Sequence, residues 1–298
     1  MKKSPVVFIV TDLEGVGGVL NFPDWCVPEG RRNECGCRFL TEEVNAVAAG
    51  FFDGGASAVI VSDAHGSGGS IRGEMLDERC YLRRGSSGSW YYPDNTDALA
   101  FVGQHAKAGT PFGHLAHTQT QAAIDFRLNG VSIGEYGQLA AVAAEQQIPT
   151  IFGAGDLAFC REAEALTPGV VTVAAKEGIC PVPPSESTPS GNVFSAESGA
   201  LHYPRSQTLP LLRSRAAEAV RKLIENPLSF QFPLIPGAPY VVTARYRDAS
   251  PEIEAMFGRK LPARRFELKP QSSVAEALQH FYSDLEWNAA DHQESWEL

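Results

Sequence analysis

Long hydrophobic runs are missing from this sequence. A membrane-spanning helix needs about 20 consecutive apolar residues, whereas the first apolar run, Val6 to Val10, is soon interrupted by Asp12. The run is also shorter than the roughly 7–15 apolar residues of a signal peptide, although the charged start at residues 1–3 resembles one. We therefore expect a cytoplasmic protein with no membrane segment.

Positive charge is also scarce. The chain has 25 Lys and Arg against 35 Asp and Glu, which gives a net charge of −10 at pH 7. An acidic protein repels the phosphates of nucleic acids and the headgroups of anionic lipids, so we expect neither kind of partner. The 298 residues are 44% hydrophobic and 20% charged, which is typical of a folded chain with one or two domains and a large core.

Sequence motifs of several common enzyme classes are absent. Residues 15–20 do not form the dinucleotide fingerprint G-x-G-x-x-G, because Leu20 occupies the place of the last glycine. The sequence contains no Walker motif and no G-x-S-x-G nucleophile elbow. It therefore gives no support to a dinucleotide-binding protein, a phosphate-loop enzyme or a hydrolase of the serine-elbow type.

Cysteine pairs with the usual spacing of a structural zinc site are missing as well. Cys35 and Cys37, together with Cys26, could supply thiolate ligands, but zinc sites usually have two pairs with a wider spacing. We expect reduced, partly buried thiols, as is usual in the cytosol. The six cysteines are Cys26, Cys35, Cys37, Cys80, Cys160 and Cys180.

Short apolar, β-branched runs alternate with helical patterns along the first 178 residues. Such runs are typical of strands buried on both faces, and their alternation with helices favours a mostly parallel sheet. The predicted strands are Val6–Val10, Ser57–Val61, Leu99–Gly103, Pro149–Gly153 and Val170–Ala174. The predicted helices are Leu40–Phe52, Ile133–Gln146 and Asp156–Leu166, and Asn129-Gly130 favours a tight hairpin. We therefore predict a three-layer α/β/α domain over residues 1–178.

The sequence pattern changes after residue 178. A Pro-rich stretch from Pro181 to Gly191 is typical of a surface loop. The elements predicted beyond it are a helix over Gln207–Glu225, strands over Tyr240–Tyr246 and Arg264–Lys269, and a helix over Ser272–Leu285. We therefore predict a second, smaller α+β domain over residues 179–298.

Polar side chains come directly after several predicted strands. Ligands of open α/β sheets bind outside the carboxyl ends of the strands, where such side chains converge. Two imidazoles and three carboxylates suit zinc, with manganese, cobalt or iron as alternatives. Five ligands suit two ions about 3.5–4 Å apart, with one carboxylate bridging them. The predicted metal ligands are Asp12, Glu14, His65, His105 and Glu135.

Two further histidines, His114 and His117, follow His105 closely. Side chains three residues apart can face the same way on a helix. Either imidazole can serve as an acid, a base or a nucleophile beside a metal, and both can equally be polar loop residues.

The sequence resembles the zinc D-aminopeptidases encoded in bacterial dipeptide-transport operons. The resemblance covers most of residues 6–178, and the C-terminal part matches only weakly. Lys176, at the end of a predicted strand, also fits. The motifs that carry it are Asp12-Leu13-Glu14-Gly15, Thr41-Glu42-Glu43-Val44-Asn45, Ser62-Asp63-Ala64-His65, Gly103-Gln104-His105-Ala106-Lys107-Ala108, His117, Gly134-Glu135 and Ala154-Gly155-Asp156.

The resemblance implies a role for each of these side chains. Asp12 bridges two zinc ions, Glu14 and His65 complete one position, and His105 and Glu135 complete the other. His117 is the catalytic histidine, a nucleophile or an acid/base. The resemblance also implies a ring-like homo-oligomer, a decamer in the family, whose active sites face an inner cavity.

Three features depart from the family pattern. Phe112 is an extra residue between Pro111 and Gly113, which leaves open whether His114 or His117 is catalytic. Gln104 occupies a place where the family often has an aromatic residue, and residues 181–202 form an insertion.

We therefore predict a metal-dependent hydrolase of an amide bond, an aminopeptidase for short peptides or amides that contain D-amino acids. One alternative is a hydrolase of other amides, cyclic amides or phosphoesters, although Lys107 is the only obvious cation to clamp a phosphate. The other alternative is a metal-stabilised binding subunit without catalysis.

Overall fold

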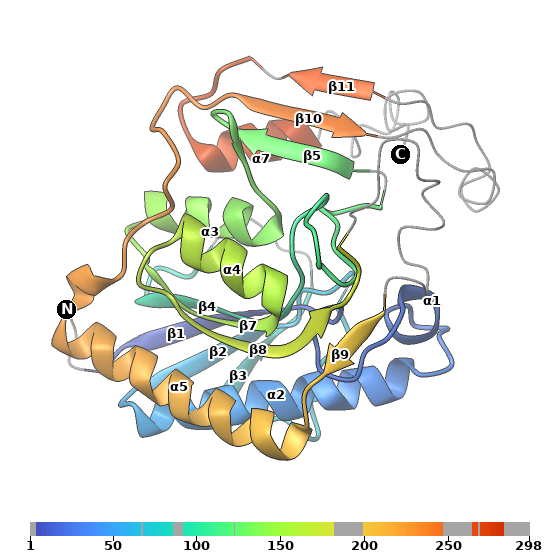
Figure 1. The fold of residues 1–298 in the computed structure, drawn as a ribbon. Coiled ribbons are helices and arrows are strands. Elements are labelled where there is room, and N and C mark those ends of the chain that lie inside the picture. Colours follow the sequence, from blue (N-terminus) through green and yellow to red (C-terminus); the bar gives the residue numbers. More distant parts are fainter. Residues whose placement is uncertain are drawn as a thin grey trace.

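A seven-stranded sheet forms the centre of the computed structural model, which describes residues 4–66, 68–85, 92–121, 123–181, 199–246, 264–267 and 269–282. The strand order is β3-β2-β1-β4-β7-β8-β9 (Figure 1). Neighbouring strands are parallel, except that β9 is antiparallel to β8. The strands are β1 (Val6–Thr11), β2 (Ala58–Ser62), β3 (Cys80–Arg83), β4 (Ala98–Gln104), β7 (Thr150–Asp156), β8 (Val171–Gly178) and β9 (Ala200–His202). The predicted α/β fold with a mostly parallel sheet is confirmed.

Helices cover both faces of this sheet. Helices α2 (Asn33–Asp53) and α5 (Arg205–Glu225) lie on one face (Figure 1). Helices α3 (Glu135–Glu145) and α4 (Leu157–Leu166) lie on the other. The three predicted layers are therefore present, and α2 begins at Asn33 rather than at the predicted Leu40.

Strand β1 shows why the central strands are apolar at every position. Val7 and Ile9 pack into the core beneath α2 and α5, whereas Phe8 and Val10 pack into the core beneath α3 and α4. Successive side chains of a strand point to opposite faces, so a strand between two helical layers must be apolar throughout. All six residues of β1 are accordingly buried.

Helices α2 and α5 pack closely because one glycine of α2 and the glycine that caps its C-terminus lie in the contact. A Cβ atom at Gly50 would lie 2.2 Å from the carbonyl oxygen of Arg213, and one at Gly54 would lie 2.7 Å from that of Ala217. Only a residue without a side chain allows this distance between the two backbones. The contact fixes α5 beside α2, whose N-terminal half lies near the carboxyl edge of the sheet.

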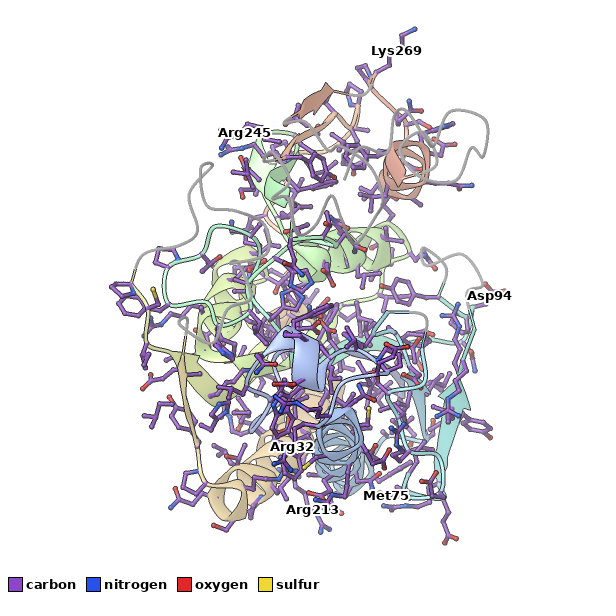
Figure 2. The ribbon with its side chains drawn as sticks, turned by 90° about the vertical axis from the view of Figure 1, so that its right-hand side faces the viewer. Arg32, Met75, Asp94, Arg213, Arg245 and Lys269 are labelled. Atoms are coloured by element: carbon purple, nitrogen blue, oxygen red, sulfur yellow. The ribbon has the colours of Figure 1, made fainter. Side chains whose placement is uncertain are left out.

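A second, antiparallel sheet has the strand order β11-β10-β5-β6. Helix α7 (Val274–Tyr282) lies between this sheet and α3 (Figure 1), and Phe281 meets Phe126 of β5 edge to face with 5.1 Å between ring centroids. Figure 2 shows Arg245 of β10 and Arg213 of α5 toward opposite ends of the molecule. The strands are β5 (Ala123–Leu128), β6 (Val131–Ser132), β10 (Val242–Tyr246) and β11 (Arg264–Glu267).

The hairpin between β5 and β6 turns at Asn129 and Gly130, as predicted. Both residues have positive φ angles, 48° and 82°, which is the geometry that tight hairpins require and that Asn-Gly supplies. The Asn129 side chain also accepts a hydrogen bond from the Val241 N–H at 2.7 Å. This bond ties the hairpin to the start of β10.

Each sheet contains strands from both sides of residue 178. Strand β9 follows that residue and belongs to the seven-stranded sheet, on which helix α5 packs. Strands β5 and β6 precede it, and β5 pairs with β6 on one side and with β10 on the other. The two domains predicted over 1–178 and 179–298 stay a prediction. Two short helices, α1 (Phe22–Trp25) and η3 (Pro227–Ser229), complete the described elements.

Some predicted features fall partly or wholly outside the described residues. Residues 182–198, which make up most of the predicted Pro-rich loop and insertion, lie outside the described residues. The last residues of the predicted helix Ser272–Leu285 do so as well. No helix within the described ranges is both long and apolar enough to cross a bilayer.

Candidate metal centre

The five predicted ligands converge at the carboxyl edge of the seven-stranded sheet. Asp12 follows β1, His65 follows β2 by three residues, His105 follows β4 directly, and Glu135 is the first residue of α3. Parallel strands end at the same edge, so residues far apart in the sequence meet there. Among the described residues, two groups of side chains could each hold a metal ion: Asp12, Glu14 and His65 (the first group), and His105, His117 and Glu135 (the second group).

The first group is compact and buried. Nδ1 of His65 lies 3.0 Å from Oδ1 of Asp12 and 3.1 Å from Oε2 of Glu14. Nε2 of His65 lies 2.7 Å from the carbonyl oxygen of Cys26. A carbonyl oxygen only accepts hydrogen bonds, so Nε2 carries the proton and Nδ1 faces the two carboxylates.

The second group has the same organisation. Nε2 of His105 lies 3.1 Å from Oδ2 of Asp12 and 3.5 Å from Oε1 of Glu135. Nε2 of His117 lies 3.6 Å from the same oxygen of Glu135. The imidazole rings of His105 and His117 stack at 3.8 Å with an angle of 16°, so both Nε2 atoms face the carboxylates.

In each of the three histidines, one ring nitrogen donates to a backbone carbonyl and the other faces the carboxylates. Nδ1 of His105 donates to the carbonyl of Ala106, and Nδ1 of His117 donates to that of Leu115, each at 2.9 Å. In metal sites, the nitrogen opposite the metal usually donates to a carbonyl or carboxylate, which fixes the ring and its tautomer. All three rings therefore present their other nitrogen to the carboxylate cluster.

Asp12 lies between the two groups. Its Oδ1 faces His65 of the first group and its Oδ2 faces His105 of the second. Oδ1 also accepts the N–H of Leu13 at 2.8 Å, and Oδ2 accepts the side-chain amide of Gln104 at 3.1 Å. This carboxylate therefore has the position that a ligand shared by two ions requires.

The charges of this cluster shift the pKa values of its members. Burial by itself lowers the pKa of His65 and of His105, but the surrounding carboxylates outweigh burial and raise both well above the ordinary value. Burial raises the pKa of Asp12, yet His105 and His65 outweigh it and lower that pKa well below its usual range. The carboxylates thus need a positive partner, which is a proton on each ring or a metal ion.

Buried polar atoms support a metal in this position. Apart from the ion-pair contacts at 3.1 Å to Nδ1 of His65 and to Oδ2 of Asp12, Oε2 of Glu14 and Nε2 of His105 have no hydrogen-bond partner among the described residues. Burying such atoms costs free energy unless another group satisfies them. Carboxylate oxygens and imidazole nitrogens are together the ligands that zinc binds, so the residues present fit two zinc ions.

His117 and His114, left as alternatives by the sequence, have different surroundings. Burial, followed by the neighbouring His105, lowers the pKa of His117, so its ring is neutral with Nε2 toward Glu135. His114 belongs to neither group and meets His202 edge to face at 6.1 Å. Burial and the charge of Lys176 lower the pKa of His114 to about 2.

Three glycines shape the strand end that presents His105. Strand β4 has an irregular register at Gln104, and Gly103 before it has a φ of +79°. Cβ atoms at Gly15 and Gly155 would lie 2.0 Å and 1.9 Å from the carbonyl oxygen of Gln104. The backbone therefore bulges between two glycines, which turns His105 into the cluster. These glycines occur in the sequence motifs, but their role could not be predicted from residue types alone.

The loop that carries His65 is held by a buried carboxylate. Asp63 accepts the N–H groups of Gly69, Ser70 and Ile71 at 2.9–3.2 Å. Three hydrogen bonds to one carboxylate close the loop around it. The roles of Asp63 and of the Gln104 amide were likewise not predicted from the sequence. The strand-end position of Asp63 was the available signal.

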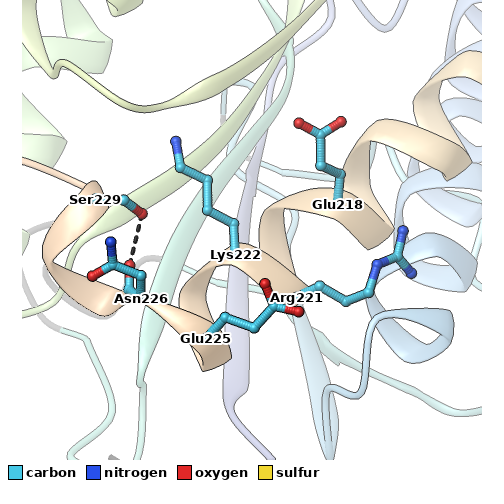
Figure 3. Close-up of a pocket in the computed structure, with 6 residues that line it drawn as sticks. All are labelled: Glu218, Arg221, Lys222, Glu225, Asn226 and Ser229. Atoms are coloured by element: carbon cyan, nitrogen blue, oxygen red, sulfur yellow. Dashed lines mark hydrogen bonds between the residues drawn. The ribbon is translucent and has the colours of Figure 1, made fainter.

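Other candidate features lie elsewhere. All six cysteines are free, and none belongs to a potential metal-binding group among the described residues. A hollow of about 340 Å³ lies at the C-terminal end of α5 (Figure 3), and none of its lining residues belongs to the two metal-binding groups. Its lining carries both charge signs: Glu218, Arg221, Lys222, Glu225, Asn226 and Ser229.

The fold and the centre define a metal-binding α/β protein, and comparison with known proteins gives its family. The chain belongs to the D-aminopeptidase family, because the family model with that description matches residues 6–251. The resemblance stated from the sequence is thereby confirmed.

Two relatives illustrate the similarity. A D-aminopeptidase of Bacillus subtilis (strain 168) is 33% identical over 178 residues, which are 58% of this chain and 64% of that relative. The match therefore spans less than two thirds of the relative's length. The solved structure of the Zn-dependent D-aminopeptidase DppA from Bacillus subtilis, described as a self-compartmentalizing protease, superposes with a TM-score of 0.70 at 24% identity. That superposition covers 92% of this chain and 95% of the other, and it shows a shared fold.

Proposed function

We propose that this chain is a zinc-dependent aminopeptidase that hydrolyses short peptides or amides with an N-terminal D-amino acid. The observation that carries the proposal is the position of Asp12. One of its carboxylate oxygens faces His65 of the first group, and the other faces His105 of the second group. Membership of the D-aminopeptidase family supports the reaction class, and a relative described as Zn-dependent supports the metal.

The two groups would hold one zinc ion each, with Asp12 shared between them and with His117 in a separate role in proton transfer. Glu14 and His65 would complete the first position, and His105 and Glu135 the second. Zinc in these positions supplies Lewis-acid chemistry for the attack of water on an amide carbonyl.

His117 is the group we assign to proton transfer. Its Nδ1 donates to the carbonyl of Leu115, so its Nε2 carries the lone pair toward the cluster. The lowered pKa keeps the ring neutral near pH 7 and ready to accept a proton from the attacking water. The same nitrogen can then donate that proton to the leaving amine.

The experiment that tests the proposal is hydrolysis of matched D- and L-alanine amides by the zinc-loaded chain, before and after chelation. We expect chelator-sensitive cleavage with a preference for the D form. The variant Asp12→Asn keeps the shape of the side chain but loses its charge and one acceptor, so it should lose both bound zinc and activity. Full zinc content and full activity in that variant would contradict the proposal.

We also propose a homo-oligomer. The support is the similar structure described as a self-compartmentalizing protease. Sedimentation should show a species several times heavier than the 32.1 kDa chain. A monomer at every working concentration would overturn this assignment and leave the metal centre unaffected.

A further inference from the structure

Two charged side chains outside the ligand groups bind the backbone segments that carry the ligands. One is Lys176 near the end of β8, whose exposed fraction is 0%. The other is Glu162 of α4, whose carboxylate points away from its own helix toward two other segments. Neither contributes an atom to the metal-binding groups among the described residues.

Lys176 holds the loop of Glu14. Its ammonium group donates to the carbonyl oxygen of Glu14 and, at 3.1 Å, to that of Val19. These two carbonyls lie at the two ends of residues 14–19. Asp156, Glu14 and Glu43 attract the same ammonium group from three different elements.

The loop needs such an anchor because of its composition. Three of its six residues are glycines at positions 15, 17 and 18, and glycine loses more conformational freedom than other residues when it is ordered. A buried ammonium group is also unfavourable unless its donors are paired. The pairing in this loop satisfies the ammonium group and fixes the backbone from which the Glu14 carboxylate extends.

Glu162 holds the segments of the second group in the same way. Its Oε2 accepts the N–H of Lys107 at 2.8 Å, and its Oε1 accepts that of Gly134 at 3.4 Å. Lys107 is two residues beyond His105, and Gly134 directly precedes Glu135. A Cβ atom at Gly134 would lie 2.7 Å from Cβ of Lys107, so the two segments touch under this carboxylate.

We propose that Lys176 and Glu162 are positioning residues that each maintain one zinc position: Lys176 the first, through the loop of Glu14, and Glu162 the second, through His105 and Glu135. This inference rests on the proposed function. It goes beyond that function because it makes the affinities of the two positions separately adjustable by residues that touch no metal.

The test measures zinc affinity in chains that keep only one position. Glu135→Gln disables the second position and Glu14→Gln disables the first. Lys176→Met in the Glu135→Gln chain should weaken zinc binding about 10- to 100-fold, which is the usual effect of losing a partner of a metal ligand. Glu162→Gln in the Glu14→Gln chain should do the same. The two crossed combinations should change affinity by less than about threefold, since they leave the remaining position untouched.

Controls separate positioning from general damage. Lys222→Met removes another lysine that donates to a backbone carbonyl, that of Gly169 at 2.6 Å. Gly169 precedes β8 at its amino end, opposite Lys176, and Lys222 lines the hollow in Figure 3. This variant should leave both affinities unchanged. Far-ultraviolet circular dichroism of the zinc-free chains checks folding. Lys176→Gln, whose shorter side chain keeps N–H donors but loses the charge, replaces Lys176→Met if that variant does not fold.

The outcomes are distinct. A selective loss at the expected position in each background supports the inference. Equal losses in matched and crossed combinations, or no loss in either, overturn it while the proposed function stands. A parent chain that binds no zinc in either position overturns the proposed function and this inference with it.

Discussion

His117 and His114 show how the backbone chooses between two neighbouring histidines. Both are buried, but only His117 faces the carboxylates, because the Leu115 carbonyl fixes its Nδ1. We expect His117→Ala to lower kcat about 10²- to 10⁴-fold, the usual contribution of a general acid or base. Zinc content should fall much less than activity. Steady-state kinetics together with metal analysis measures both.

His114→Leu is the matched variant. His114 is buried and belongs to neither metal-binding group, so an apolar side chain of similar size should leave kcat near the parent value. The pKa of His114 in the folded chain, about 2, lies below the ordinary value of 6.5. The unfolded chain therefore binds a proton at His114 more readily than the folded chain does, and the parent loses stability as pH falls below about 6.5. His114→Leu should therefore unfold less readily than the parent near pH 5. If His114→Leu were inactive and His117→Ala active, the assignment would be reversed.

At the scale of residues, the sequence predicted which side chains meet but not how they are oriented. Asp12 and His105 directly follow strands, so their convergence followed from the α/β pattern. The membership of His117 in the second group depends on the carbonyl that its ring bonds, and the Gln104 contact with Asp12 depends on the bulge of β4. A pattern of residue types does not encode these orientations.

The glycine-lined bulge at the end of β4 is the element that is most sensitive to substitution. An alanine Cβ at Gly155 would lie 1.9 Å from the Gln104 carbonyl oxygen, so the strands must separate. We expect Gly155→Ala to lower the free energy of unfolding by about 1–3 kcal/mol or more and to weaken zinc binding. Gly237→Ala, where a Cβ would meet nothing within 4 Å, is the control. Urea unfolding and zinc titration measure both effects, and equal stabilities for the two variants would refute the role of the bulge.

The contact between α2 and the loop of Gly17 predicts a pH dependence of stability. Burial raises the pKa of Glu43 from its ordinary 4.5 to about 7, against the opposing charge of Arg205. The folded chain therefore binds a proton more tightly at Glu43 than the unfolded chain does. This contribution to stability is full below about pH 4.5 and is lost as pH rises through about 7.

Glu43→Gln isolates this effect. The variant lacks the ionisation, while its amide oxygen can still accept the Gly17 N–H that Glu43 accepts at 3.0 Å. Between about pH 5 and pH 8, the parent should lose up to about 3 kcal/mol more stability than the variant. Thermal unfolding of the parent and of the variant across this pH range measures the difference. If the stabilities of the two chains changed with pH in the same way, ionisation of Glu43 would not contribute to the pH dependence.

At the scale of elements, prediction succeeded where burial is two-sided. The apolar runs of β1, β4 and β7 and the Asp156 cap of α4 all fall where the pattern indicated them. The edge strands β3 and β9 were missed, because β3 is half-exposed and carries Arg83 and β9 is only three residues long. An edge strand is defined by its neighbour, and its own sequence shows little alternation.

For the whole molecule, metal removal should affect stability as well as activity. Without zinc, the carboxylates of Asp12, Glu14 and Glu135 lie close together, and protonated histidines must supply most of the balancing charge. Zinc that binds the folded state alone stabilises it by mass action, by about 4 kcal/mol at a thousandfold excess over Kd. Chelation should therefore lower Tm by roughly 5–15 °C in a chain of this size. Differential scanning calorimetry with and without chelator measures it, and an unchanged Tm would mean that no metal stabilises the fold.

The hairpin of the second sheet lies between two residues of the metal centre in the sequence. Residues 118–134 run from His117 to Glu135, and they contain the hairpin of β5 and β6. That hairpin is held by β10, more than a hundred residues later. The residues on both sides of the hairpin are therefore tied to the antiparallel sheet. A shift of β5 relative to β10 would change the separation of His117 and Glu135, because the hairpin joins these two residues along the chain.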